Sequence, residues 1–196
     1  MAGMLIETEL TPNPATRKFL PGRPVSPSGP LDFASPEAAA ASPLAEALFD
    51  LGDVTGVHFG TDFVSVSAAP GVDWVTLEAD VATILLDHFT AAMPLMREDR
   101  EGNGIKVPAE HDSQFAVDPA DADIVAQIEE LLDSRVRPAV ANDGGDISFR
   151  GYEKGHVYLA MHGACAGCPS STATLKHGVE SLLKHYVPEV VAVHAV

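Results

Sequence analysis

The apolar periodicity of this chain stops between residues 93 and 123 and resumes on the far side. The intervening stretch, MPLMREDREGNGIKVPAEHDSQFAVDPADAD, mixes glycine, proline and charged residues and follows neither a helical nor a strand repeat, which is typical of a linker. A segment of viable domain size remains on each side of it. The sequence therefore predicts two small domains, 1–92 and 118–196, joined by a linker over 93–117.

The first segment predicts the order strand, helix, strand, strand, helix. MLIETEL and GVHFGTDFVSVSA supply the strands, the latter as a pair joined at Gly60, whereas the proline-rich TPNPATRKFLPGRPVSPSGP predicts a loop. Helices are expected to begin after Ser42 and near Asp73, where apolar residues start to recur at helical spacing.

The second segment predicts the order helix, strand, strand, cysteine loop, helix, strand. Asp118 and Pro119 open a helix as cap and first residue, and Pro138 with the following NDGGD is expected to end it. DISFRGY and HVYLAM alternate as a hairpin, and VVAVHAV reads as a final strand after a helix that stops at Pro188. The predicted fold class is α+β, with two small mixed α/β-sandwich-like domains.

The charge balance restricts the partners that the chain can have. It carries 12 Lys+Arg against 28 Asp+Glu and no basic cluster, so nucleic acid is not an expected partner. No apolar run of about 18 residues is available to cross a bilayer, so no membrane partner is expected either. MAGMLIETEL lacks the features of a signal or transit peptide, and a cytoplasmic protein is therefore predicted.

The only two cysteines of the chain, Cys165 and Cys168, lie in the loop GACAGCPSS between a predicted strand and a predicted helix. Glycines allow the backbone to wrap around an ion, and the small alanines are expected to leave both sulfurs accessible. Backbone N–H groups and the positive end of the helix dipole should favour the thiolate form. The loop has the properties that a pair of thiolate ligands needs.

Four interpretations of this cysteine pair fit the residues alone. The thiols could be small buried hydrophobic residues, or a thiol-disulfide oxidoreductase pair with Cys165 as nucleophile. Zinc would need four ligands in one chain, with His162 and His177 as the nearest nitrogens. Two copies of the chain would instead supply the four thiolates that an iron-sulfur cluster usually requires.

The second segment resembles a known family. GGDISFRGYEKGHVYLAMHGACAGCPSSTATLKHGVESLLKHYVPEV is similar to the NifU-like C-terminal domain of the Nfu-type iron-sulfur cluster carriers over roughly residues 118–196, and TPNPATRKFLPG with GVHFGTDFVSVS is similar to the Nfu N-terminal domain. The resemblance implies a carrier or scaffold, not an enzyme. It also implies that Cys165 and Cys168 bind a 4Fe-4S cluster, with 2Fe-2S as an alternative, between the subunits of a homodimer.

Such a carrier would receive the cluster from an upstream assembly scaffold and pass it to apo iron-sulfur proteins. The N-terminal domain has no cysteine, so it cannot hold iron through thiolates. Its NPATRKF segment, expected to be exposed, is a candidate contact for targets through Arg17 and Lys18. The alternative is a loop in which Asn13 and Pro14 maintain their own turn.

Overall fold

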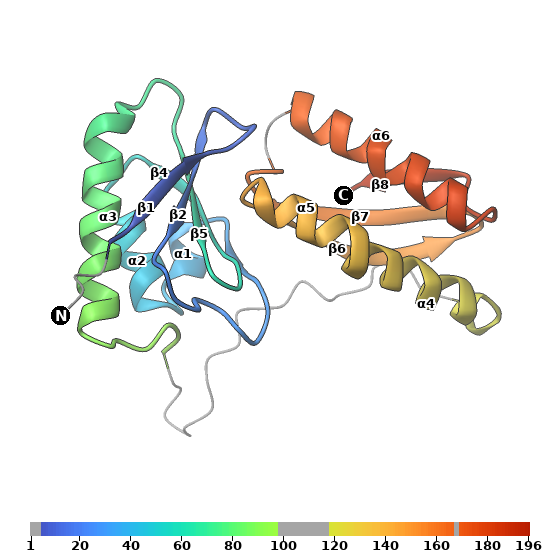
Figure 1. Cartoon of the computed structure of the whole chain (residues 1–196), viewed down its shortest axis with the longest axis horizontal. Coiled ribbons are helices and arrows are strands. Elements are labelled where there is room, and N and C mark those ends of the chain that lie inside the picture. Colours follow the sequence, from blue (N-terminus) through green and yellow to red (C-terminus); the bar gives the residue numbers. More distant parts are fainter. Residues whose placement is uncertain (1–4, 98–117, 167–168) are drawn as a thin grey trace. The chain divides into compact units, whose positions relative to one another are not determined.

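The computed structural model describes residues 5–97, 118–166 and 169–196, and its contacts divide the chain into two compact units (Figure 1). The first unit is Met1–Pro108 and the second is Ala109–Val196. Each unit combines helices with one sheet, which confirms the α+β fold class. The limits set at 1–92, 93–117 and 118–196 stay a prediction, because most of the expected linker lies outside the described residues.

The first unit contains a five-stranded sheet in which every described pairing is antiparallel. Across the sheet the strands follow the order β1 (Glu7–Leu10), β2 (Thr16–Leu20), β5 (Val64–Ala68), β4 (Val54–Phe59) and β3 (Leu31–Phe33). Strands β4 and β5 form the predicted pair. Phe19, Phe59 and Val66 are fully buried, so the sheet supplies one wall of the core.

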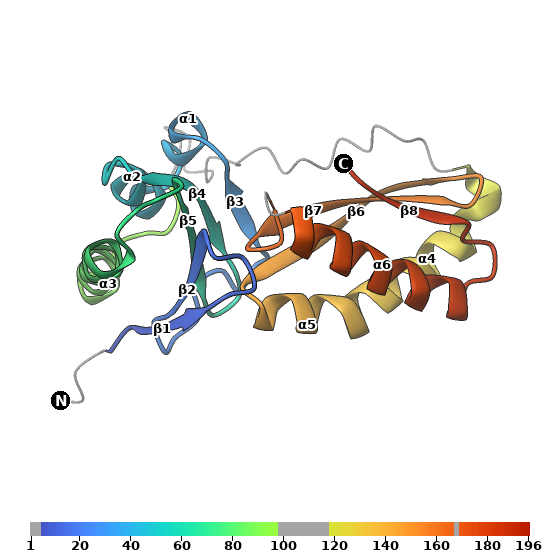
Figure 2. The ribbon, with the colours of Figure 1, turned by 90° about the horizontal axis from the view of Figure 1, so that it is seen from above.

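Three helices cover one face of this sheet (Figure 2). They are α1 (Pro36–Ala39), α2 (Pro43–Phe49) and α3 (Trp74–Thr90), each starting after a side chain that accepts a backbone N–H. Ser42 caps α2, as the sequence predicts, and Asp73, near which the next helix was expected to begin, caps α3. Apolar side chains of α2 and α3 close the core against the sheet.

Strands β2 and β3 occur within or next to a segment predicted to be loop. The prolines that suggested a loop flank β2 rather than interrupt it, since Pro14 precedes the strand and Pro21 follows it. Asn13 forms the preceding turn by accepting the Ala15 N–H at 3.0 Å with its side-chain oxygen. The loop prediction was therefore wrong for β2, whereas β3 follows the predicted loop and was not predicted.

The first residues of the expected linker pack against the first unit. Arg97 N–H donates to the Ala41 carbonyl at 2.8 Å, and the Ser42 hydroxyl donates to the Leu95 carbonyl at 2.6 Å. Leu95 and Met96 also lie against the core of this unit. Residues 93–97 thus continue the first unit in the described part of the chain.

The second unit opens with one long, irregular helical segment. The 3-10 turn η1 (Pro119–Asp121) leads into α4 (Ala122–Leu131), the π-turn η2 (Leu132–Val136) and α5 (Arg137–Asn142). Pro138 was expected to help end the helix, and that prediction was wrong because helical backbone continues to Asn142. A proline has no N–H for the carbonyl one turn back, and the chain accommodates it with the π-turn directly before α5.

The second unit's sheet has the order β6 (Gly145–Glu153), β7 (His156–Gly163) and β8 (Ala192–Ala195). Strands β6 and β7 form the predicted antiparallel hairpin, with positive φ at Lys154 and Gly155 in the turn. Strand β8 pairs parallel to β7 after the crossover helix α6 (Pro169–Tyr186). The helices lie on one face of this sheet, where their apolar side chains form the second core (Figure 2).

Candidate functional site: the cysteine loop

The cysteine loop connects the end of β7 to the start of α6. Because β7 and β8 are parallel, the loop lies at the carboxyl end of a strand and the N-terminal end of a helix in a β-α-β unit. Ligands are commonly bound at this place in α/β folds. The topology therefore places Cys165 where a bound group would meet strand ends and helical N–H groups.

Hydrogen bonds hold the described part of the loop on both sides. Ala164 N–H donates to the Gly144 carbonyl at 3.0 Å, which joins the loop to the start of β6. The Thr172 hydroxyl in the first turn of α6 donates to the Cys165 carbonyl at 3.0 Å. Gly163 has a φ of +60°, which favours glycine and turns the chain out of β7.

The Cys165 thiol is buried. Only 7% of the residue is exposed, and it belongs to the same apolar cluster as Val140 and Ile147. The prediction that small neighbouring alanines leave the sulfur accessible was therefore wrong for Cys165. The sulfur instead lies close to Gly145 at the start of β6.

The prediction that the loop favours the thiolate form was also wrong for Cys165. Burial raises the pKa of its thiol to about 12, and the negative charges of Asp143 and then Asp146 add to the effect. The sequence had indicated only a turn at NDGGD. That these two carboxylates flank the thiol depends on the tertiary fold, which no local pattern reports.

Asp146 is itself fixed by Arg137. The guanidinium donates from Nε to Oδ1 at 3.1 Å and from Nη2 to Oδ2 at 3.0 Å, while the Asp146 side chain is only 10% exposed. This two-point contact ties α5 to the first residues of β6. A negative charge is thereby held in a fixed place beside the cysteine loop.

Cys168, together with Gly167, lies outside the described residues. The structure therefore gives no distance between the two sulfurs, and the assignment of both cysteines as ligands stays a prediction. The described part of the loop places Cys165 four positions before the start of α6, so the chain from Cys165 to α6 is short.

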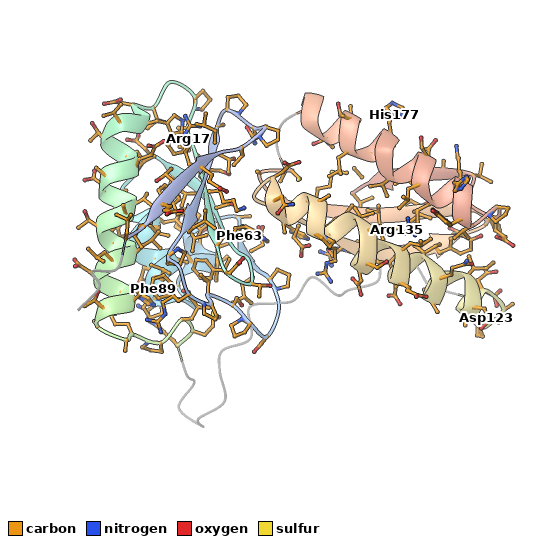
Figure 3. All side chains as sticks on the ribbon, in the orientation of Figure 1. Arg17, Phe63, Phe89, Asp123, Arg135 and His177 are labelled. Carbon is orange, nitrogen blue, oxygen red and sulfur yellow. The ribbon has the colours of Figure 1, made fainter. Side chains whose placement is uncertain are left out.

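The histidines considered for a zinc site do not gather around Cys165. His162 Nε2 lies 2.8 Å from the Ser148 hydroxyl on the neighbouring strand, and His177 is exposed on the outer side of α6 (Figure 3). Within residues 5–97, 118–166 and 169–196, no three His, Cys, Asp or Glu side chains are grouped to hold a metal ion. The single-chain zinc interpretation gains no support from this part of the molecule.

The segment NPATRKF is largely engaged within the first unit. Arg17 lies over the ring of Trp74, 4.5 Å from its centroid, and its Nε donates to Glu78 at 2.8 Å (Figure 3). Lys18 is 7% exposed and pairs with Glu9 at 3.2 Å. The expectation of an exposed contact segment was wrong for these two side chains, whose contacts lie within the first unit.

Comparison with known families assigns both units. Residues 6–92 match the family described as "Scaffold protein Nfu/NifU N terminal", and residues 128–194 match the family described as "NifU-like domain". The two matches fall on the first and second units, respectively, and the second includes the cysteine loop.

Similar proteins cover nearly the whole chain. "NFU1 iron-sulfur cluster scaffold homolog, mitochondrial" from Homo sapiens is 42% identical over 98% of this chain and 72% of its own length. "NifU-like protein 5, mitochondrial" from Arabidopsis thaliana is 43% identical over 95% of this chain and 66% of its own length. The chain therefore belongs to the Nfu family of iron-sulfur cluster scaffold proteins. It spans about two thirds of the length of these relatives.

A solved structure of a NifU-like protein from Saccharomyces cerevisiae has a more distant likeness. It covers 49% of this chain and 87% of its own length, with a TM-score of 0.44 and 19% identity.

The expectation of a cytoplasmic protein was wrong, because the relatives named above are described as mitochondrial. That expectation depended on ten N-terminal residues, which say little when the chain spans only part of its relatives' length. In the described part of the structure, no helix combines the length and apolar character needed to cross a bilayer.

Proposed function

We propose that this chain binds an iron-sulfur cluster through Cys165 and Cys168 and transfers it to apo iron-sulfur proteins. The observation that carries the proposal is the position of the chain's only cysteine pair in the loop between β7 and α6 of a NifU-like unit. An upstream assembly scaffold would supply the cluster. The role is that of a carrier rather than a catalyst.

Ligand number supports a site shared by two copies of the chain. Iron-sulfur clusters are usually held by four cysteine thiolates, and one chain supplies two. A two-fold axis through the site would bring together two equivalent loops. We propose a 4Fe-4S cluster at this position, with 2Fe-2S as the alternative.

Burial of Cys165 fits a carrier that releases its cargo. A thiol whose pKa is raised to about 12 is protonated near neutral pH, so iron must displace that proton to bind. Returning the thiol to its buried, protonated state favours release. Cluster binding and cluster transfer would thus be balanced by the same side chain.

The alternative function is a thiol-disulfide oxidoreductase. The β-α-β connection around the loop suits this function better than the sequence indicated, because β7 and β8 are parallel. The raised pKa of Cys165 works against it, since the attacking species in disulfide exchange is the thiolate. This function predicts that a monomer is active and that Cys168→Ala traps a mixed disulfide.

Anaerobic native mass spectrometry after supplying iron and sulfide tests the proposal, because it reads subunit number and cluster mass together. We expect a dimer of two 20.6 kDa chains carrying one cluster. Cys165→Ala and Cys168→Ala should each abolish this species, whereas the matched control His177→Ala on the exposed side of α6 should retain it. A monomer without iron, or one holding a single zinc ion, would contradict the proposal.

A further inference from the structure

Gly144 directly precedes β6 and Gly145 is the first residue of that strand, and the fold requires glycine at each for a different reason. Gly144 has a φ of +79°, a backbone conformation that other residues seldom adopt. Gly145 has no positive φ, so its backbone would accept a side chain. The restriction at Gly145 is therefore one of space.

The atom nearest to this space is the sulfur of Cys165. A Cβ atom at position 145 would lie 2.6 Å from the Cys165 Sγ and 2.8 Å from the His162 carbonyl oxygen. Both distances are well below van der Waals contact, and the interior is close-packed. The thiol is thus the nearest atom to this volume, which the His162 carbonyl oxygen and the Cys165 backbone nitrogen, 3.1 Å from the same position, also border.

The backbone around Cys165 has little freedom to avoid such a clash. The loop is tied to Gly144 through the Ala164 N–H and to α6 through the Thr172 hydroxyl, each at 3.0 Å. Rotation about the Cα–Cβ bond of Cys165 moves the sulfur out of this volume, whereas the contact with the His162 carbonyl oxygen also requires a small shift of the backbone.

We propose that Gly145 is a positioning residue that seats the Cys165 thiol inward in the cluster-free chain. To bind a cluster shared with a second chain, the thiol must turn out of this buried position. The inference rests on the proposed function for the identity of Cys165 as a ligand. Gly145 then determines how much of the cluster-free chain presents an exposed ligand.

The rate of alkylation of Cys165 in the cluster-free chain tests directly whether the thiol is held in the buried position. In a Cys168→Ala background, where Cys165 is the only thiol, Gly145→Ala should raise the second-order rate of reaction with iodoacetamide by about tenfold or more. This change corresponds to losing a preference of about 1.4 kcal/mol for the inward position. Circular dichroism establishes that each variant is folded.

Gly178→Ala is the matched control. It makes the same substitution in the same unit, but a Cβ at Gly178 meets no atom within 4 Å, so its rate should equal that of the parent. Thr172→Val provides a second route, because it frees the Cys165 carbonyl without adding volume near the sulfur. We expect it to raise the rate severalfold.

A folded Gly145→Ala chain that reacts within twofold of the Gly178→Ala control would overturn the proposal. If Gly145→Ala does not fold, the Thr172→Val rate decides, and equality with the control overturns it. Failure of the proposed function has a different signature. In that case no chain with both cysteines would acquire a cluster, whatever the alkylation rates of the single-thiol variants.

Discussion

Arg137 fixes the position of Asp146 beside the cysteine loop. Its two hydrogen bonds pair its positive charge with the Asp146 carboxylate, and breaking a fully buried ion pair from one side costs about 3–5 kcal/mol. The Arg137 side chain is 36% exposed, so water reaches this pair and the cost is smaller. We expect Arg137→Met to lower the free energy of unfolding of the second unit by about 2 kcal/mol.

Urea unfolding followed by tyrosine fluorescence measures this loss selectively. All three tyrosines of the chain, Tyr152, Tyr158 and Tyr186, lie in the second unit. The control is Asp133→Asn, which removes only the exposed partner of Arg137 and should change stability by less than about 0.5 kcal/mol. Equal losses of unfolding free energy in the two variants would mean that the contact with Asp146 contributes no more to stability than the contact with Asp133.

Arg17 makes a comparable contribution to the first unit. Its stacking on Trp74 and its ion pair with Glu78 are each worth about 0.5–1 kcal/mol in partly exposed settings. Arg17→Ala should therefore destabilise the first unit by about 1–2 kcal/mol, read from the fluorescence of Trp74, the chain's only tryptophan, in urea. Glu78→Gln, which removes the ion pair and keeps the stacking, should cost about half as much.

A different result would support the hypothesis that the NPATRKF segment contacts target proteins. An Arg17→Ala chain with unchanged stability but slower cluster transfer to a target would show that the side chain acts on a partner rather than within the unit.

At the scale of elements, Glu180 links α6 to the last strand. Its carboxylate accepts the Val193 N–H of β8 at 3.0 Å and pairs with Lys184 at 2.7 Å. The Lys184 contact first and the Val193 N–H second lower the pKa of Glu180 from 4.5 to about 2. Both contacts favour the charged carboxylate, which only the folded state provides with these partners.

This link makes the stability of the second unit depend on pH in a defined direction. Because the folded-state pKa of Glu180 is depressed, its contribution is present above about pH 4.5 and is lost as the pH falls toward 2. We expect Glu180→Gln to lower the urea midpoint at pH 6, and the difference from the parent to shrink at pH 3. A difference that stays constant between these pH values would contradict the assignment.

The elements that could be predicted from the sequence are those with local determinants. Helices α2 and α3 begin after Ser42 and Asp73, where the sequence predicts helix starts, and apolar residues at helical spacing face the core. Strand β2 was not predicted, because the nearby prolines favoured a loop over its five residues of strand. Pro138 predicted a helix end that the structure does not have, because the π-turn before it accommodates the proline within the helical segment.

The features of the candidate site could likewise be predicted from the sequence only where their determinants are local. The cysteine pair and its place between a strand and a helix follow from sequence alone. The burial of Cys165 and the charges of Asp143 and Asp146 near it do not, because they arise where the start of β6 meets the loop after β7. Gly145 could be recognised as a turn residue from its sequence context, but its place beside the Cys165 sulfur depends on the tertiary fold.

At the scale of the whole molecule, net charge opposes the association that the proposed function needs. Each copy carries a formal charge of −16, and a dimer brings two such copies together. Repulsion between like-charged molecules is screened by salt, with a Debye length of about 10 Å at 0.1 M ionic strength. The cluster must therefore supply enough binding free energy to overcome this repulsion.

It follows that added salt should strengthen the cluster-loaded dimer. We expect anaerobic sedimentation velocity to show a larger dimer fraction in about 200 mM NaCl than in about 20 mM at the same chain concentration. The cluster-free Cys165→Ala chain should stay monomeric in both conditions, which separates screening from salt-driven aggregation. A dimer that dissociates as salt is added would instead mean that attractive ion pairs across the interface outweigh the net charge, and the cluster would not be acting alone in holding the two chains together.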